Sequence, residues 1–155
     1  MKPLTKLVEM QAQGTIQEKF GVAIGDVSRA WRDKVTQRLK PTGLSQSRWT
    51  ALLYLSRIEG GLAQSDLARM LGIEPPTVTR LVKQLEDEAW VTRIAPPEDA
   101  RVKMVRLTPK ARRVVVRINA AINQLRAETV GRLSEDQARA GFDTLQILQK
   151  LIDEA

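Results

Sequence analysis

The side chains best equipped for chemistry lie in one short stretch, and their chemistry is recognition rather than catalysis. Read along the chain, they are Pro76, Thr77, Thr79, Arg80 and Lys83. A guanidinium can donate two hydrogen bonds to the edge of a guanine, and threonine can bond a phosphate or touch a thymine methyl. Apolar residues at helical spacing would anchor the opposite face; these are Val78, Leu81, Val82 and Leu85. The stretch predicts a helix whose first turns enter the major groove of DNA, with Pro76 setting the entry angle.

A second polar group follows, on a loop between two apolar runs. Asp99 and Arg101 lie near its tip, and Lys103 begins the second run. An arginine on a projecting tip suits insertion into a narrow minor groove, and Asp99 could brace the Arg101 side chain. Periodicity alone leaves the first stretch open to interpretation as an ordinary helix with a solvated polar face. The charged hairpin beside it favours a DNA-binding site.

Catalytic and metal sites have little support. The chain has no cysteine and no histidine, which excludes disulfides, cysteine nucleophiles and the usual zinc ligands and removes the commonest general base. The carboxylates Glu86, Asp87 and Glu88 form one run without a nucleophile or base partner, so a solvated helix end is their simplest interpretation. We expect neither an enzyme nor a bound metal or cofactor.

The overall charge fits a polyanionic partner, but its distribution complicates that interpretation. The 155 residues carry a formal net charge of +7. Within residues 60–108, however, basic and acidic residues balance, so affinity for DNA must depend on where a few cations stand. This neutrality keeps an alternative open, a winged-helix module that binds protein instead of DNA. Without a signal-peptide pattern or a bilayer-spanning apolar run, we expect a cytoplasmic protein that binds no membrane.

Short elements must position these residues. Helices are expected at 64–71 and 75–88, because apolar residues recur at helical spacing on either side of Gly72, which permits a tight turn. Strands are expected at 90–94 and 102–107, since the prolines of the polar loop between them exclude a helix. This order of elements is typical of a winged helix-turn-helix.

Longer amphipathic helices are expected on both sides of this unit. The first covers about residues 16–39, after a loosely held N-terminal arm, and stops at Pro41. The predicted fold class is mainly α with a small β-hairpin wing. We divide the compact chain into an N-terminal arm and dimerisation helix (1–44), a DNA-binding lobe (45–108) and C-terminal dimerisation helices (109–155).

The two C-terminal helices carry the evidence for dimerisation. Thr108 followed by Pro109 begins one, and a capping box of Ser134 and Gln137 begins the other. Positions at near-heptad spacing form two seams that are apolar except at Thr129; they are 114, 118, 122, 125 and 129, and 138, 142, 145, 148 and 152. A lobe this small cannot cover both seams, so we predict pairing with the N-terminal helix and with a second subunit in a homodimer.

Three segments resemble a known family. LARMLGIEPPTVTRLVKQLED and DARVKMVRLTPKA are similar to the recognition helix and wing of the MarR family of bacterial transcriptional regulators. WRDKVTQRLKPTGLSQSRW and the IEPP pattern resemble its SlyA-like branch. The resemblance covers roughly residues 20–150. It implies a mainly α winged-helix protein that regulates transcription.

The resemblance also implies particular partners and roles. A triangular homodimer would place two winged helices in successive major grooves of a palindromic promoter site, with Arg80 in the major groove and Arg101 in the minor groove. A small aromatic carboxylate would bind between the dimer helices and the DNA-binding lobe, with Arg29 meeting the carboxylate and Trp49 stacking on the ring. Ligand binding would change the separation of the two lobes and release DNA, in a repressor or an activator.

The chain departs from the family pattern at three positions. Leu53 stands where SlyA-like relatives carry a polar histidine, which bears on the ligand site. Ala100 replaces an arginine common at the wing tip. Ala89 replaces the usual glycine after the recognition helix, and a left-handed backbone there would cost about 1 kcal/mol.

Overall fold

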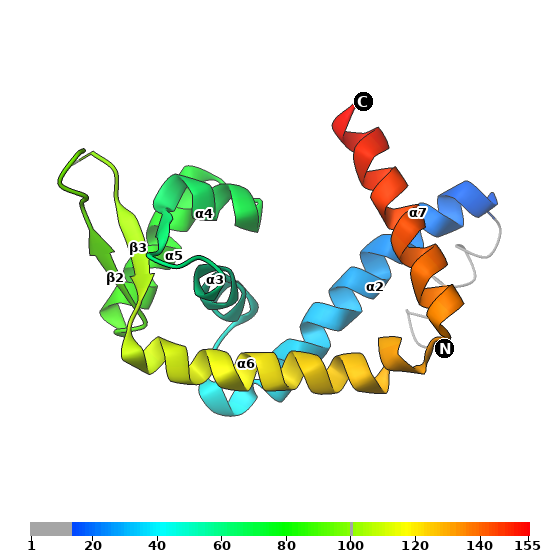
Figure 1. The fold of residues 1–155 in the computed structure, drawn as a ribbon, viewed down its shortest axis with the longest axis horizontal. Coiled ribbons are helices and arrows are strands. Elements are labelled where there is room, and N and C mark those ends of the chain that lie inside the picture. Colours follow the sequence, from blue (N-terminus) through cyan, green and yellow to red (C-terminus); the bar gives the residue numbers. More distant parts are fainter. Residues whose placement is uncertain (1–13, 100) are drawn as a thin grey trace, which may run out of the picture.

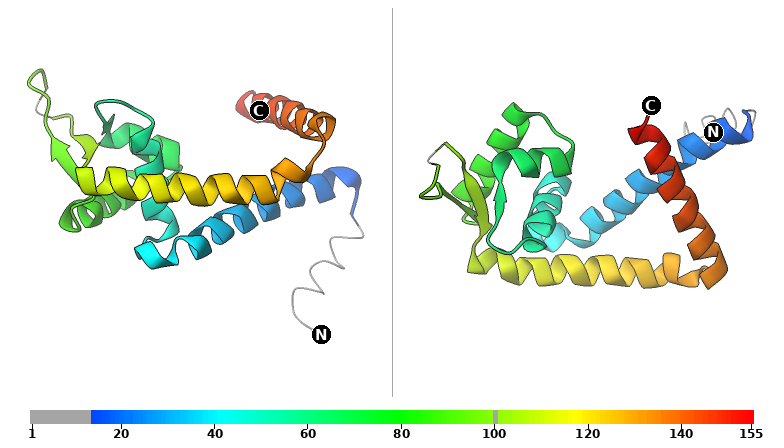
Figure 2. Two further views of the ribbon diagram at one scale, coloured as in Figure 1. Left: turned by 60° about the horizontal axis from the view of Figure 1, so that its bottom comes forward. Right: turned by 45° about the horizontal axis from the view of Figure 1, so that its top comes forward.

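The computed structural model describes residues 14–99 and 101–155, and within them the chain forms a small lobe attached to a frame of long helices (Figure 1). The lobe holds α3 (Gln46–Ser56), α4 (Gln64–Leu71), α5 (Pro75–Asp87) and the sheet. The frame consists of α2 (Ile16–Arg38), α6 (Pro109–Glu128) and α7 (Glu135–Asp153). Helix α6 runs from the lobe to α7, and both views of Figure 2 again show it connecting the two. The expected N-terminal arm and Ala100 lie outside the described residues.

Two of the three frame helices, α6 and α7, begin at the caps that the sequence predicts. Helix α2 covers Ile16–Arg38 and is followed by a 3₁₀ turn, Lys40–Thr42. Helix α6 covers Pro109–Glu128, where the Thr108 side chain accepts a hydrogen bond from the Ala111 amide. A second 3₁₀ turn, Val130–Arg132, leads to α7, Glu135–Asp153, whose capping box of Ser134 and Gln137 is complete.

The lobe contains the expected helix-turn-helix. Helix α3 covers Gln46–Ser56, α4 covers Gln64–Leu71 and α5 covers Pro75–Asp87. Gly72 ends α4 with a φ of 64°, a left-handed conformation that glycine adopts without strain. The predicted tight turn between α4 and α5 is therefore confirmed.

The predicted hairpin is part of a three-stranded antiparallel sheet. Strands β2 (Val91–Ile94) and β3 (Met104–Leu107) pair as expected, and β1 (Leu62–Ala63) adds to the other side of β3. The sequence did not predict β1, because a strand of two residues carries no periodicity. A Cβ on Gly61 would lie 2.4 Å from the Val105 carbonyl oxygen, so glycine is required where β1 approaches β3.

One continuous core joins the lobe to the frame. It contains Trp49 and Leu52 of α3, Leu67 of α4, Val82 of α5 and Ile118 of α6, together with other buried apolar residues of these elements. Much of the predicted seam on α6 is therefore buried within its own chain, because Val114, Ile118 and Leu125 pack into this core. In contrast, α7 has no buried residue. Within the described part of the chain, no helix is long and apolar enough to cross a membrane.

Ala89 adopts a left-handed backbone, with a φ of 60°. Because a Cβ is disfavoured there, Ala89→Gly is expected to raise the free energy of unfolding by about 1 kcal/mol. Urea denaturation followed by circular dichroism measures this change. Ala120→Gly, in the interior of α6, is the control and should lower stability by about 0.5–1 kcal/mol. If Ala89→Gly and Ala120→Gly lower the free energy of unfolding equally, the backbone at Ala89 is not strained.

Candidate nucleic-acid interface

Helix α5 presents the predicted recognition residues on its exposed face. Its anchoring residues Val78, Leu81, Val82 and Leu85 are buried, as the periodicity predicts. The predicted contact residues are all exposed; these are Pro76, Thr77, Thr79, Arg80 and Lys83. At 3.6 residues per turn, Pro76, Arg80 and Lys83 share the outermost face, and Thr77 and Thr79 lie on its two sides.

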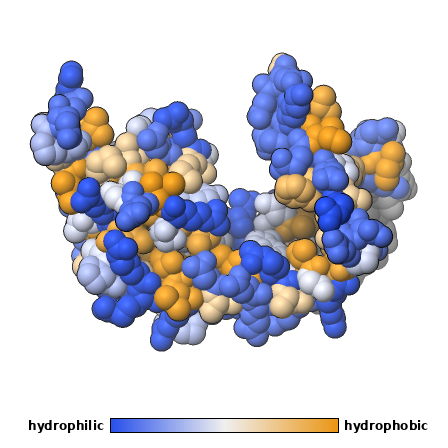
Figure 3. Space-filling model, viewed as in Figure 1, coloured by the Kyte–Doolittle hydropathy of each residue, from blue (hydrophilic) through white to orange (hydrophobic). Residues whose placement is uncertain are grey.

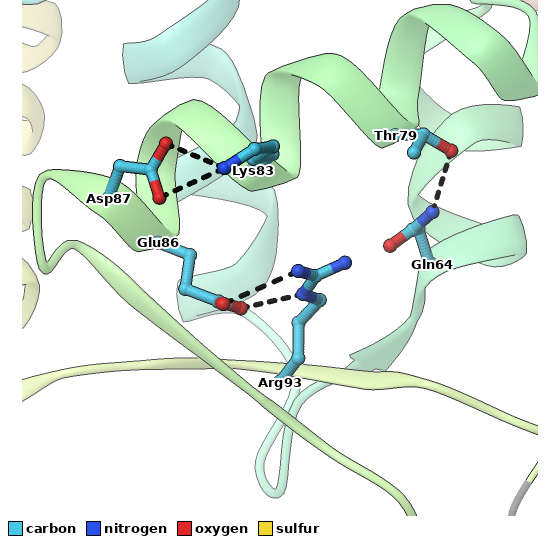
Figure 4. Close-up of polar contacts among 6 residues, drawn as sticks. All are labelled: Gln64, Thr79, Lys83, Glu86, Asp87 and Arg93. Atoms are coloured by element: carbon cyan, nitrogen blue, oxygen red, sulfur yellow. Dashed lines mark hydrogen bonds and ion pairs between the residues drawn. The ribbon is translucent and has the colours of Figure 1, made fainter.

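The outermost cations of α5 differ in their partners. The Lys83 ammonium lies 3.1 Å from an oxygen of Asp87, one turn further along the helix (Figure 4). Among the residues that the structure describes, Arg80 forms no ion pair. Within that part of the chain, its guanidinium is therefore the cation of this face that has no carboxylate partner. It can approach a hydrogen-bond acceptor without first breaking an ion pair.

The first turn of α5 has few backbone amides to offer a phosphate. Pro75 and Pro76 have no N–H, and the Thr77 amide donates to the Glu74 carbonyl at 2.9 Å. Helix N-termini often bind anions through free amides. An anion at this end of α5 would therefore be bound mainly by side chains.

The Thr79 hydroxyl is held by two hydrogen bonds. It donates to the Pro75 carbonyl at 2.9 Å and accepts from the Gln64 Nε2 at 3.0 Å. Gln64 reaches Thr79 from the start of α4 (Figure 4). Sequence reasoning did not single out Gln64, since only the packing of α4 on α5 brings these two residues together.

The wing carries the braced arginine that the sequence predicts. Asp99 accepts hydrogen bonds from the Arg101 backbone amide at 2.9 Å and from its Nε at 3.2 Å. The Arg101 side chain is still 93% exposed, so it projects into solvent with part of its freedom removed. Lys103 is also exposed. Its backbone carbonyl accepts a hydrogen bond from the backbone N–H of Gln64 at 3.0 Å, which connects the wing to α4.

The acidic run at the end of α5 is paired while it stays in contact with solvent. Arg93 of β2 donates to Glu86 at 2.6 Å, and this hydrogen bond lowers the pKa of Glu86 below its ordinary value (Figure 4). Glu88 pairs with Arg48 at 2.7 Å and accepts from the Trp90 indole at 3.0 Å. The expected solvated helix end is therefore also a paired one, because the fold brings cations from α3 and β2 to these carboxylates. Their negative charge is offset close to the helix end.

A cavity of about 680 Å³ lies between the frame and the lobe. Its lining residues are Trp31, Arg32, Ser45, Gln46, Ser47, Trp49, Thr50, Leu53, Tyr54, Arg57, Leu71, Ile73, Ile122 and Arg126. Trp49 lines it as expected, while its indole donates to the Thr36 hydroxyl at 2.9 Å. Arg29 is not a lining residue. It is exposed on α2 and pairs with Asp26 at 2.5 Å.

Comparison with known proteins decides the family of this chain. A MarR-family model matches residues 42–102. The solved transcriptional regulator PA3341 is 38% identical, with a TM-score of 0.76 over 86% of this chain and 98% of its own. The chain belongs to the MarR family. This MarR protein also shares its fold with CouR from Rhodococcus jostii RHA1, crystallised with p-coumaroyl-CoA, at 24% identity and a TM-score of 0.76 over 88% and 95% of the two chains.

A DNA complex shows the same fold. The structure of S. aureus MepR bound to DNA is 23% identical to this MarR protein, with a TM-score of 0.78 over 86% of this chain and 97% of that one. Membership of the family makes the protein a DNA-binding transcriptional regulator and not an enzyme.

Proposed function

We propose that this MarR protein binds a palindromic promoter site as a homodimer and that a small anionic aromatic ligand controls this binding. The observation that carries the proposal is the shared exposure of Arg80 on α5 and Arg101 on the wing. One arginine suits a guanine edge in the major groove and the other suits a narrow minor groove. Thr77, Thr79, Lys83, Asp99 and Lys103 complete the proposed interface, with Pro76 at the leading turn.

The frame supports a homodimer. Helix α7 has 19 residues and none is buried, although it exposes Phe142, Leu145, Ile147, Leu151 and Ile152. A cavity of about 670 Å³ lies between α2 and α7, lined mainly by apolar side chains that include Phe20, Val27 and Leu145. Figure 3 shows apolar side chains on the parts of the surface that these two helices form. An amphipathic helix is rarely stable without a partner for its apolar face, and a second copy of the frame supplies one.

A twofold dimer accounts for a palindromic site. Two lobes related by a twofold axis present identical α5 helices, so each reads the same half-site in opposite directions. Residues 45–108 act as the reading lobe in this proposal, and the flanking segments 1–44 and 109–155 set the distance between the two lobes.

The cavity between frame and lobe supports an anionic aromatic ligand. It has three guanidinium groups, those of Arg32, Arg57 and Arg126, and no acidic lining residue within the described chain. Tyr54 and Trp49 supply aromatic surface at the same cavity. Arg32 lies about one turn beyond Arg29 on α2, and we assign to it the carboxylate contact that the family resemblance suggests for Arg29. The aromatic CoA ester held by CouR is a ligand of compatible chemistry.

The position of the cavity suggests how ligand and DNA compete. Arg32 belongs to the frame, whereas Leu71 and Ile73 flank the turn that leads into α5. A ligand that contacts both parts stabilises one separation of the two lobes, and DNA stabilises another. The ligand then controls DNA binding by shifting the population between the two lobe separations.

Selection of bound sequences from random duplex DNA tests the proposal. We expect enrichment of a palindrome, an affinity that falls as salt rises, and release when salicylate or p-coumaroyl-CoA is added. Binding of unrelated duplexes with equal affinity would contradict sequence-specific recognition. A protein that binds no duplex even at low salt would instead fit the alternative, a winged-helix module for protein partners.

A further inference from the structure

The side chain of Thr79 has little hydrogen-bonding capacity left for DNA. A threonine hydroxyl has one proton, and Thr79 donates its proton to the Pro75 carbonyl at 2.9 Å. One of its two lone pairs accepts from the Gln64 Nε2 at 3.0 Å. Donation to a phosphate or to a base acceptor would therefore break a bond within α5. The side chain remains exposed, and its methyl group is the part that is free to make a contact.

Gln64 selects the orientation of that methyl. In a helix, threonine divides between two χ1 rotamers because its hydroxyl can bond the preceding turn in either. In the rotamer that the structure holds, the side-chain amide of Gln64 approaches from α4 and donates to the Thr79 hydroxyl (Figure 4). This hydrogen bond holds the Thr79 methyl in one direction relative to the neighbouring Arg80.

The Gln64 side chain is poorly suited to a purely structural role. Its Oε1 atom is buried and has no hydrogen-bond partner among the described residues. A buried polar atom without a partner opposes folding, so an apolar side chain of similar size would be at least as stable. The useful part of Gln64 is the amide nitrogen that it presents to Thr79.

We propose that Thr79 recognises thymine through the 5-methyl group of the base, and that Gln64 is the positioning residue that aims the Thr79 methyl. The proposal rests on the proposed binding of α5 in the major groove, where the thymine methyl is exposed. It differs from recognition through the hydroxyl, which would favour a phosphate or a polar base edge. Contact between two methyl groups corresponds to about a fourfold preference for thymine over uracil at one base pair.

Single replacement of thymine by deoxyuridine in a selected duplex tests this inference. The duplex is first selected from random DNA by the full-length protein, and each thymine is then replaced in turn. Fluorescence anisotropy at fixed salt should show a loss of about fourfold at one position in each half-site, and about fifteenfold when both are replaced. Thr79→Val keeps a methyl, and valine holds one rotamer in a helix without a hydrogen bond from Gln64, so this variant should keep the thymine preference. Thr79→Ser keeps the hydroxyl alone and should bind thymine and uracil equally.

Gln64→Met tests the positioning role separately. It should reduce the thymine preference at the same position by at least half without lowering the thermal unfolding temperature. Gln84→Met, on the exposed surface of α5 away from Gln64, is the matched control and should leave that preference unchanged. A wild-type protein that binds DNA but ignores every replacement refutes methyl recognition, and an unchanged preference in Gln64→Met refutes the role of Gln64. A protein that binds no duplex refutes the proposed function itself.

Discussion

Replacing Arg80 with alanine is expected to weaken binding to the preferred duplex by about 10- to 100-fold, while binding to random duplex changes little. A bidentate pair between arginine and guanine contributes about 1–3 kcal/mol of discrimination. Arg80 is exposed on the outermost face of α5 and has no ion pair within the described residues, so its guanidinium is available for this contact. Fluorescence anisotropy with the selected duplex and with a scrambled duplex, at one salt concentration, measures both affinities.

Two further variants separate shape from charge. Arg80→Lys keeps the positive charge but loses the planar guanidinium that can donate two parallel hydrogen bonds. It should bind the scrambled duplex like the wild type and still lose most of the preference for the selected duplex. Arg101→Ala removes the exposed arginine of the wing and should weaken binding without changing the preference at the positions that α5 contacts. If the ratio of affinities for the selected and the scrambled duplex is the same in Arg80→Ala as in the wild type, Arg80 does not read a base.

Introducing a charge at Leu145 is expected to produce a monomer and to reduce affinity for the palindrome by about 100-fold or more. Leu145 lines the apolar cavity between α2 and α7 and is 48% exposed in the single chain. Leu145→Glu would bury a carboxylate in the proposed interface, which is strongly unfavourable without a partner. A monomer then binds each half-site separately and loses the gain of linked binding, which is commonly 10²- to 10⁴-fold. Sedimentation velocity gives the oligomeric state, and anisotropy gives the affinity.

The neighbouring residue provides the control. Gln146→Glu adds the same charge to α7 at an exposed polar position and should leave the dimer and its DNA affinity close to wild type. Because Leu145 is not part of the core of the single chain, Leu145→Glu should keep the helical circular dichroism spectrum. A Leu145→Glu variant that remains a dimer with full affinity would exclude α7 from the interface.

Local signals predicted most of the secondary structure. The pairs Thr108–Pro109 and Ser134–Gln137 act within one turn, so their residue types are enough to place the starts of α6 and α7. The spacing of Val78, Leu81 and Leu85 likewise determines which face of α5 is buried. The brace between Asp99 and Arg101 was predictable for the same reason, since the two residues are only two apart.

Contacts between distant segments were not predictable from these signals. Glu88 pairs with Arg48, which is 40 residues earlier, and Gln64 bonds Thr79 across the helix-turn-helix. Strand β1 is another such case, because its two residues become a strand only through pairing with β3. The exposure of Arg29 on α2 has the same origin, since periodicity places a residue on a helix face but does not say which face borders the cavity.

By itself, the sequence determined the order of the helices and of the two hairpin strands, the buried face of α5 and the exposed residues proposed to contact DNA. These properties depend on interactions within a few residues, where side-chain type and spacing decide the free energy. The tertiary structure alone decided which charges are neutralised, leaving Arg80 without an ion pair among the described residues while Glu86 and Glu88 are paired. Electrostatic and hydrogen-bonding energies depend on distances through space, and only the packing of α3, α4 and the sheet around α5 determines those distances.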